Sequence, residues 1–292
     1  MRIAFIGFGE AARAFTDSLM ATGHALSFSA FDLKQDATMT EAMRARGVAQ
    51  AATPEAALLD ADWIIAAVTA DQSLVAAQSV LAGLAQGQLY VDINSVSPDR
   101  KQQAAALIEA RGARYLDMAV MAPVHPRGHA TPVLVAGACA EAVRPELESL
   151  GFSFDVVGPA PGDATAIKMV RSLFVKGLEA ITVECALAAA ASGVYDRVMP
   201  SLERSYPQLD WAADVPYRFE RTLRHGARRA AEMREVGETI DALGLTGGLA
   251  REIAEVQARM GALAATDLSG DVPLPEVVAE IARLRGARVR ES

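Results

Sequence analysis

The strongest constraint on the fold is the regular alternation of short β-type runs with Ala-rich helical segments across residues 1–120. A strand that pairs in parallel with its neighbour needs a long crossover connection, and a helix is the usual one. The alternation therefore predicts an α/β fold with a doubly wound, parallel sheet. We expect strands at residues 2–6, 26–31, 63–68, 89–93 and 114–119, and two further strands that extend the sheet at 133–136 and 154–157.

The pattern changes after Gly158-Pro-Ala-Pro-Gly162, because a segment so rich in Pro and Gly suits neither a helix nor a strand interior. Beyond it, the hydrophobic period is helical to the end of the chain. The sequence thus predicts two domains, an α/β domain over residues 1–160 and an all-helical domain over 161–292. The expected helices are a long one from Asp163 to about Ser192, and others at 217–243, 248–263 and 275–286.

The charge balance argues against two classes of partner. The chain has 292 residues, with 28 Lys and Arg against 36 Asp and Glu, for a net charge of −8. Proteins that coat nucleic acid or an anionic membrane carry a basic surface instead. The longest uncharged stretch, residues 72–91, is interrupted by Gln and Ser, so no membrane span is predicted. We expect neither nucleic acid nor a membrane as a partner.

Cysteine usage and the start of the chain bear on the compartment. Cys139 and Cys185 lie in unrelated contexts without metal-ligand spacing, which predicts no metal site and favours a reducing compartment. An apolar run begins at the second residue and leaves no room for a signal peptide. These features predict a cytoplasmic protein.

A glycine motif directly follows the first expected strand. Residues 7–12 read Gly-Phe-Gly-Glu-Ala-Ala, the G-x-G-x-x-A form of the dinucleotide fingerprint. The first glycine allows a tight turn, the second lets the backbone approach a pyrophosphate, and the final Ala allows close packing of helix on strand. The helix start also favours an anion through its free N–H groups. The predicted cofactor contacts are Gly7, Phe8, Gly9, Glu10, Ala11 and Ala12, with the Glu10 side chain expected to point to solvent.

Asp32 strengthens this interpretation. It stands 20 residues after Ala12, at the end of the second expected strand, where a carboxylate can bind the adenosine ribose and repel a 2′-phosphate. NAD is therefore slightly favoured, although Lys34 leaves NADP open. A methyltransferase also has a Gly-rich first loop and a later acidic residue, but the helical second half is larger than that fold requires.

With these motifs, the chain resembles the β-hydroxyacid dehydrogenases, which include 3-hydroxyisobutyrate and 6-phosphogluconate dehydrogenases. The resemblance rests on Ile6–Gly9, the Asp92-Ile-Asn-Ser-Val-Ser-Pro98 segment, Asp117–Val120, and Gly162 followed six residues later by Lys168. It implies an N-terminal Rossmann domain that binds NAD or NADP, followed by a helical domain for substrate binding and dimerisation. We also expect Val68, Thr69, Asn94 and Ser95 to contact the cofactor.

The resemblance implies that Lys168 is the catalytic acid or base, because a lysine near the start of the long interdomain helix has that role in the family. The chemistry is reasonable: when hydride reaches a carbonyl carbon, negative charge grows on the oxygen, and an ammonium can protonate it. The alternative is a solvated lysine on a polar helix face.

The chain departs from the family around the expected substrate site. Ser172 stands where the family usually has an Asn, and Met121-Ala-Pro123 replaces a Ser-Gly-Gly loop that would bind a small carboxylate through its N–H groups. These changes argue against an ordinary short β-hydroxyacid and are similar to a divergent branch of the family. The expected substrate contacts are Met121, Ala122, Pro123, His125, Arg171, Ser172 and Arg228.

Two basic segments offer further anion sites. One is the loop that contains His125, Arg127 and His129; the other is the helix around Arg228, where Arg residues recur at helical spacing. Interleaved Glu residues make a salt-bridged surface helix an equally good interpretation of the second.

The predicted function is hydride transfer between NAD(P) and a small, anionic hydroxyacid or ketoacid. Reduction of an imine is an alternative, as is a dinucleotide-binding regulator without turnover. Because Ile167, Phe174 and Ile181 share an apolar helix face that needs a cover, we also expect a homodimer.

Overall fold

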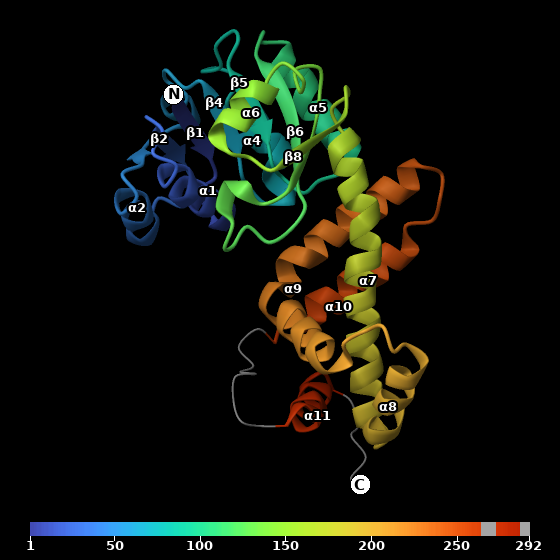
Figure 1. The fold of residues 1–292 in the computed structure, drawn as a ribbon. Coiled ribbons are helices and arrows are strands. Elements are labelled where there is room, and N and C mark those ends of the chain that lie inside the picture. Colours follow the sequence, from blue (N-terminus) through green and yellow to red (C-terminus); the bar gives the residue numbers. More distant parts are fainter. Residues whose placement is uncertain (264–272, 287–292) are drawn as a thin grey trace. The chain divides into compact units, whose positions relative to one another are not determined.

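The computed structural model describes residues 1–263 and 273–286 (Figure 1). The chain divides into two compact units, residues 1–170 and 171–292. Residues 264–272 and 287–292 of the predicted helical domain lie outside the described residues.

The first unit is built on one eight-stranded sheet with strand order β3-β2-β1-β4-β5-β6-β7-β8. Strands β1 to β6 run parallel, whereas β7 is antiparallel to β6 and parallel to β8. This order confirms the predicted doubly wound α/β fold. The strands are β1 (Arg2–Ile6), β2 (Ser27–Phe31), β3 (Ala49–Gln50), β4 (Trp63–Ala66), β5 (Leu89–Asp92), β6 (Arg114–Val120), β7 (Val133–Ala136) and β8 (Phe154–Gly158).

Helices cover both faces of this sheet (Figure 1). Successive strand residues point to opposite faces, so Ile3 and Phe5 join one core with α1 and α6, while Ala4 and Ile6 join another with α4 and α5. Both faces of the central strands are therefore buried. The helical segments of this unit are α1 (Glu10–Met20), α2 (Ala37–Arg44), α3 (Pro54–Ala57), η1 (Ala70–Gln72), α4 (Ser73–Ser79), α5 (Pro98–Glu109), η2 (Gly128–Ala130) and α6 (Arg144–Leu150).

A long helix, α7 (Asp163–Ala191), begins in the first unit and continues into the second. The second unit also contains α8 (Tyr195–Ser205), α9 (Trp211–Ala242), α10 (Gly248–Gly261) and α11 (Leu274–Leu284). Its apolar core joins α7, α9, α10 and α11 through residues such as Leu187, Phe219, Met260 and Ile281.

Two features of the helical unit differ from the sequence-based expectation. Helix α8 was not predicted, since Pro200 lies inside it, and an internal proline usually ends a helix. Helix α9 begins at Trp211 rather than near Tyr217, because the Asp210 carboxylate accepts a hydrogen bond from the Ala213 amide and caps an earlier start.

The basic residues of α9 are divided between interior and surface. Arg229 is buried and pairs with Glu179 at 2.8 Å, and Arg218 is buried against Thr182 and Asp214. Arg224, in contrast, pairs with Glu220 at the surface. The salt-bridged interpretation of this helix therefore holds for Arg224, whereas Arg218 and Arg229 join α9 to α7 inside the unit.

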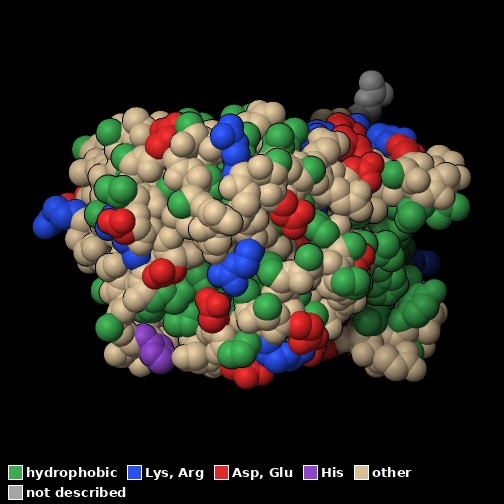
Figure 2. All heavy atoms as spheres, turned by 90° about the horizontal axis from the view of Figure 1, so that it is seen from above, with side chains coloured by type: hydrophobic (Ala, Val, Ile, Leu, Met, Phe, Trp, Pro, Cys, Tyr) green, Lys and Arg blue, Asp and Glu red, His purple; other side chains and the backbone are tan. Residues whose placement is uncertain are grey.

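On the face that Figure 2 displays, Lys and Arg side chains are interspersed with Asp and Glu. Within the described part of the chain, no helix combines the length and the apolar character that a membrane crossing requires.

Candidate active site

The sheet gathers most of the predicted cofactor residues at one edge. Strands β1, β2, β4, β5 and β6 are parallel, so their carboxyl ends meet there. In doubly wound sheets, ligands bind at this edge. The predicted residues that directly follow these strands are Gly7 to Ala12 after β1, Asp32 after β2, Val68 and Thr69 after β4, Asn94 and Ser95 after β5, and Met121 after β6.

The turn after β1 has the shape that the glycine motif predicts. Gly7 has a φ of +86°, and a Cβ there would lie 2.4 Å from the Ala67 carbonyl oxygen, so only glycine fits. At Gly9 a Cβ would meet no atom within 4 Å, so the backbone faces open space. Helix α1 begins at Glu10 without a side-chain cap, and Glu10 is exposed as expected. The free N–H groups and open space fit a pyrophosphate.

Asp32 links the ends of β1 and β2. Its Oδ2 accepts a hydrogen bond from the Phe8 amide at 2.7 Å, and its Oδ1 accepts one from the Lys34 amide at 2.8 Å. The Phe8 side chain is buried in the sheet core, so this residue faces the cofactor edge through its backbone. The Asp32 carboxylate is thereby fixed beside the glycine turn, the position from which it can bind a ribose.

Asn94 joins the loops after β4 and β5. It is buried, and its Oδ1 accepts a hydrogen bond from the Val68 amide at 2.7 Å, which ends β4 at Ala66 rather than at Val68. Thr69 is exposed at the start of the next short helix. Asn94 therefore shapes the cofactor edge by holding two loops together.

Lys168 lies at the same edge, on the first turns of α7. Its Nζ donates a hydrogen bond to Ser95 Oγ at 2.6 Å. Gly162, with a φ of +104°, makes the turn into this helix, and the Thr165 hydroxyl donates to the Val96 carbonyl at 2.9 Å. The helix that carries Lys168 is thus attached directly to the loop that carries Ser95.

Sequence reasoning missed the buried charge cluster beneath this pair. Lys101 is 0% exposed, and its Nζ lies 3.0 Å from Asp92 Oδ1 and 3.2 Å from Asp117 Oδ1. Asp117 Oδ2 accepts hydrogen bonds from the amides of Gly162 and Thr165 and so caps α7. One signal was present in the sequence: Lys101 shares a helical face with Ala104, Ala105 and Ile108, all of which are buried.

Burial shifts the pKa values of Asp117 and Tyr115. Removal from water raises the pKa of the Asp117 carboxyl, while Lys101 and the Thr165 amide oppose the rise. Burial also raises the pKa of Tyr115 well above its ordinary value, helped by the nearby Asp92 charge. Tyr115 therefore keeps its proton, and its hydroxyl donates a hydrogen bond to Asp92 Oδ2 at 2.7 Å.

The loop after β6 separates its two histidines. Met121 is partly buried and its amide donates to the Pro132 carbonyl at 2.9 Å, whereas Ala122, Pro123, His125 and Arg127 are exposed. His129 is buried, with its Nδ1 2.8 Å from Ser18 Oγ and its ring edge-on to Phe152. His129 thus fixes the loop on α1, and His125 and Arg127 are the basic side chains of this loop that face solvent.

We expect His129 to make folding acid-sensitive. Burial lowers its pKa below the ordinary value near 6.5, so the unfolded chain takes up the proton first. The contribution of His129 to the free energy of unfolding is complete above pH 6.5 and falls as the pH drops toward the folded-state pKa, by less than about 1.4 kcal/mol per pH unit. Denaturant unfolding at several pH values between 5 and 8 measures how this free energy depends on pH. The dependence should be weaker in His129→Gln and unchanged in the exposed control His24→Gln. An equal dependence in both variants and the parent would contradict this role.

Three predicted substrate residues belong to the helical unit. Arg171 is exposed on α7. Ser172 is 9% exposed, and its Oγ accepts a hydrogen bond from Lys176 at 3.4 Å. Arg228 donates to Glu232 Oε1 at 2.8 Å, and Lys176 pairs with Glu232 Oε2 at 2.7 Å. Ser172 and Arg228 are therefore joined through one lysine and one glutamate.

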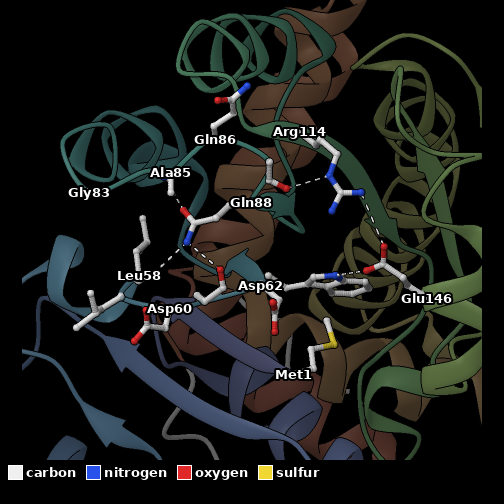
Figure 3. Close-up of a pocket in the computed structure, with 14 residues that line it drawn as sticks. Met1, Leu58, Asp60, Asp62, Gly83, Ala85, Gln86, Gln88, Arg114 and Glu146 are labelled. Atoms are coloured by element: carbon white, nitrogen blue, oxygen red, sulfur yellow. Dashed lines mark hydrogen bonds and ion pairs between the residues drawn. The ribbon is translucent and has the colours of Figure 1, made fainter.

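A hollow of about 900 Å³ opens at the opposite, amino edge of the sheet (Figure 3). Its polar groups largely bind one another: the Trp63 indole donates to Glu146 at 2.8 Å, and the Gln88 amide donates to the Ala61 carbonyl at 2.8 Å. Because ligands of such sheets bind at the carboxyl edge, we assign this hollow no part in the chemistry.

Over residues 1–263 and 273–286, no group of three or more His, Cys, Asp or Glu side chains is arranged to hold a metal ion. Both cysteines are free thiols.

Two family models match the chain. One, described as the NAD binding domain of 6-phosphogluconate dehydrogenase, matches residues 2–158, more than half of the chain. The other, described as a domain of unknown function (DUF1932), matches residues 189–260.

Individual proteins extend the similarity. The solved structure of a conserved hypothetical protein from Sinorhizobium meliloti is 34% identical, with a TM-score of 0.73, and covers 97% of this chain and 96% of that one. The NAD-dependent L-serine dehydrogenase of Pseudomonas aeruginosa is 26% identical over 73% of this chain and 72% of its own length. Mycobacterium tuberculosis 3-hydroxyisobutyrate dehydrogenase, solved with L-serine, has the same fold, with a TM-score of 0.73 at 22% identity over 96% and 98% of the two chains.

The glycine turn, the uncapped helix start and Asp32 agree with the first family model, and the Sinorhizobium relative is similar over nearly the whole length. The chain therefore belongs to the 6-phosphogluconate dehydrogenase-like family of β-hydroxyacid dehydrogenases, and it is an NAD(P)-dependent oxidoreductase.

Proposed function

We propose that this enzyme interconverts a small, anionic hydroxyacid and the corresponding carbonyl compound, with Lys168 as the general acid or base. The bound nicotinamide dinucleotide supplies or accepts the hydride. In the reducing direction, Lys168 Nζ gives a proton to the carbonyl oxygen as the carbon gains hydride; in the oxidising direction, it takes the hydroxyl proton.

The observation that carries this proposal is the hydrogen bond from Lys168 Nζ to Ser95 Oγ at 2.6 Å. It brings an amine, the donor that the reaction needs, to the carboxyl edge of the sheet beside the cofactor loops. A solvated lysine on a polar helix face would have no such partner. In addition, Ser95 provides a hydroxyl that can pass hydrogen bonds between Lys168 and a bound ligand.

The loop after β6 indicates how the substrate anion is bound. The Met121 amide already donates a hydrogen bond to the Pro132 carbonyl, and Pro123 has no N–H. Of the three residues 121–123, only Ala122 retains a backbone amide that could bind a substrate carboxylate. We infer that side chains replace the missing amides, and His125, Arg171, Ser172 and Arg228 are the proposed contacts.

The direct test is a panel of hydroxyacids, ketoacids and cyclic imines, with NADH and NADPH absorbance as the readout. We expect turnover of at least one hydroxyacid or ketoacid. Turnover of imines alone would replace the substrate class. Tight cofactor binding without any turnover would favour a regulator, and thermal stabilisation by S-adenosylmethionine but neither dinucleotide would favour a methyltransferase.

Asp32 should set the preference for NAD. We expect Asp32→Ser to lower the ratio of the NADPH Kd to the NADH Kd by about tenfold, because it removes a negative charge that would face the 2′-phosphate. Fluorescence titration with both reduced cofactors measures this ratio. Asp32→Asn is the matched control for hydrogen bonding, since it keeps an acceptor for the Phe8 amide and also loses the charge. A ratio unchanged in both variants would show that Asp32 does not select the cofactor.

We also propose a homodimer held by the apolar face of α7. Phe174 is 73% and Ile181 66% exposed on this helix, and so large an apolar surface favours a partner. Phe174→Glu combined with Ile181→Glu should yield monomers in sedimentation equilibrium, whereas Leu59→Glu, at an exposed apolar residue of the first unit, should not. A monomeric parent protein would refute the dimer.

The free cysteines also favour a cytoplasmic location.

A further inference from the structure

Lys101 is a buried lysine for which the proposed reaction has no use. Its Nζ donates a hydrogen bond to the Asp92 carbonyl oxygen at 2.6 Å, and it forms ion pairs with Asp92 Oδ1 at 3.0 Å and Asp117 Oδ1 at 3.2 Å. Buried ion clusters are often no more stabilising than apolar side chains of the same volume. Stability alone is therefore a poor reason for a charged cluster at this place.

Each carboxylate of the cluster also holds a second segment. Asp92 Oδ1 accepts a hydrogen bond from the backbone amide of Asn94 at 2.9 Å, at the beginning of the loop after β5. Asp117 Oδ2 accepts hydrogen bonds from the Gly162 amide at 3.1 Å and the Thr165 amide at 3.0 Å, at the beginning of α7. The Lys101 ammonium thus connects the loop after β5 with the start of α7.

These two segments carry the two residues of the candidate catalytic pair, Ser95 and Lys168. Ser95 follows Asn94 directly, and Lys168 lies within one helical turn of Thr165. A displacement of either segment would therefore change the distance of 2.6 Å between Lys168 Nζ and Ser95 Oγ.

We propose that Lys101 is a positioning residue. It holds the loop after β5 and the start of α7 at the separation that allows Lys168 Nζ to donate its hydrogen bond to Ser95 Oγ. It acts through Asp92 and Asp117 and does not touch the reacting atoms. The inference rests on the proposed role of Lys168, but its geometric consequence can be measured without a substrate.

Two variants test this geometry. Lys101→Met combined with Asp117→Asn removes one charge of each sign and keeps an acceptor for the Gly162 and Thr165 amides. Lys101→Arg keeps the charge but replaces a point donor by a planar fork, and it serves if the double variant does not fold. The control is Arg229→Met combined with Glu179→Gln, which removes a buried ion pair from the helical unit.

Crystal structures of the full-length variants give the first readout. We expect Lys168 Nζ to lie beyond hydrogen-bond distance, about 3.5 Å, from Ser95 Oγ in the Lys101 variants and within it in the control. An intact contact in the Lys101 variants would overturn the proposal, whatever their stability.

Kinetics give the second readout once a substrate is found. We expect kcat to fall about 100-fold in the Lys101 variants, as for a small misplacement of a catalytic group, with the cofactor Kd changed less than about twofold. In a Lys168→Ala background the same changes should alter kcat less than about twofold, because there is no longer a lysine to position. An equal loss in both backgrounds would overturn the proposal. If Lys168→Ala itself retains activity, the proposed function fails, and the crystal structures still decide whether Lys101 sets the geometry.

Discussion

Replacement of Lys168 by Ala should lower kcat by about 10² to 10⁴, the usual contribution of a positioned general acid or base. The cofactor Kd should change little, because the glycine turn and Asp32 are in separate segments from Lys168. The measurement is steady-state turnover on the best substrate of the panel, together with fluorescence titration of the reduced cofactor. Lys168→Met, which keeps most of the side-chain volume, should behave like Lys168→Ala.

Arg111→Ala is a suitable control for this variant. Arg111 is an exposed cation between the end of α5 and the start of β6, at the amino edge of the sheet. It should retain full turnover. Retention of activity within tenfold by Lys168→Ala would show that the acid or base is another group.

Replacement of Asp117 by Ala should produce the largest loss of stability, about 3 to 5 kcal/mol in the free energy of unfolding of the first unit. Asp117 is 0% exposed, and its loss would leave Lys101 with one carboxylate and the Gly162 and Thr165 amides without their acceptor. Trp63 is buried in this unit, so its fluorescence in a Trp211→Phe background follows the unfolding in guanidinium.

Asp117→Asn separates the two causes of this loss. It keeps an oxygen for the start of α7 but removes the charge opposite Lys101, so it should be less damaging than Asp117→Ala. A loss below about 1 kcal/mol for Asp117→Ala would mean that Lys101 and the Gly162 and Thr165 amides tolerate the loss of their common partner, contrary to our account.

Local patterns were sufficient to predict most of the first unit. The central strands are buried on both faces, so they read as continuous apolar runs separated by helical segments, and this alternation predicts the sheet. The end of β4 was not predictable in this way. The strand stops at Ala66 because the Val68 amide binds Asn94, which lies in a different loop.

The site divides in the same manner. The glycine turn and Asp32 are separated by one strand and one helix, so a spacing rule finds them. The partners of Lys101 come from neighbouring strands β5 and β6, where Asp92 pairs with Asp117 in register. That contact depends on the order of strands in the sheet. Only the position of Lys101 among buried residues of α5 was readable from the sequence, and a lysine there is easily mistaken for a solvated one.

The most direct test of the central claim is transfer of deuterium from reduced cofactor labelled at nicotinamide C4. Full-length protein is incubated with the labelled cofactor and the ketoacids of the substrate panel, and the products are analysed by mass spectrometry. Our account predicts a hydroxyacid that carries one deuterium on the former carbonyl carbon, and about 10² to 10⁴ less of it with Lys168→Ala. Absence of deuterium from every product, despite saturation with cofactor, would contradict it.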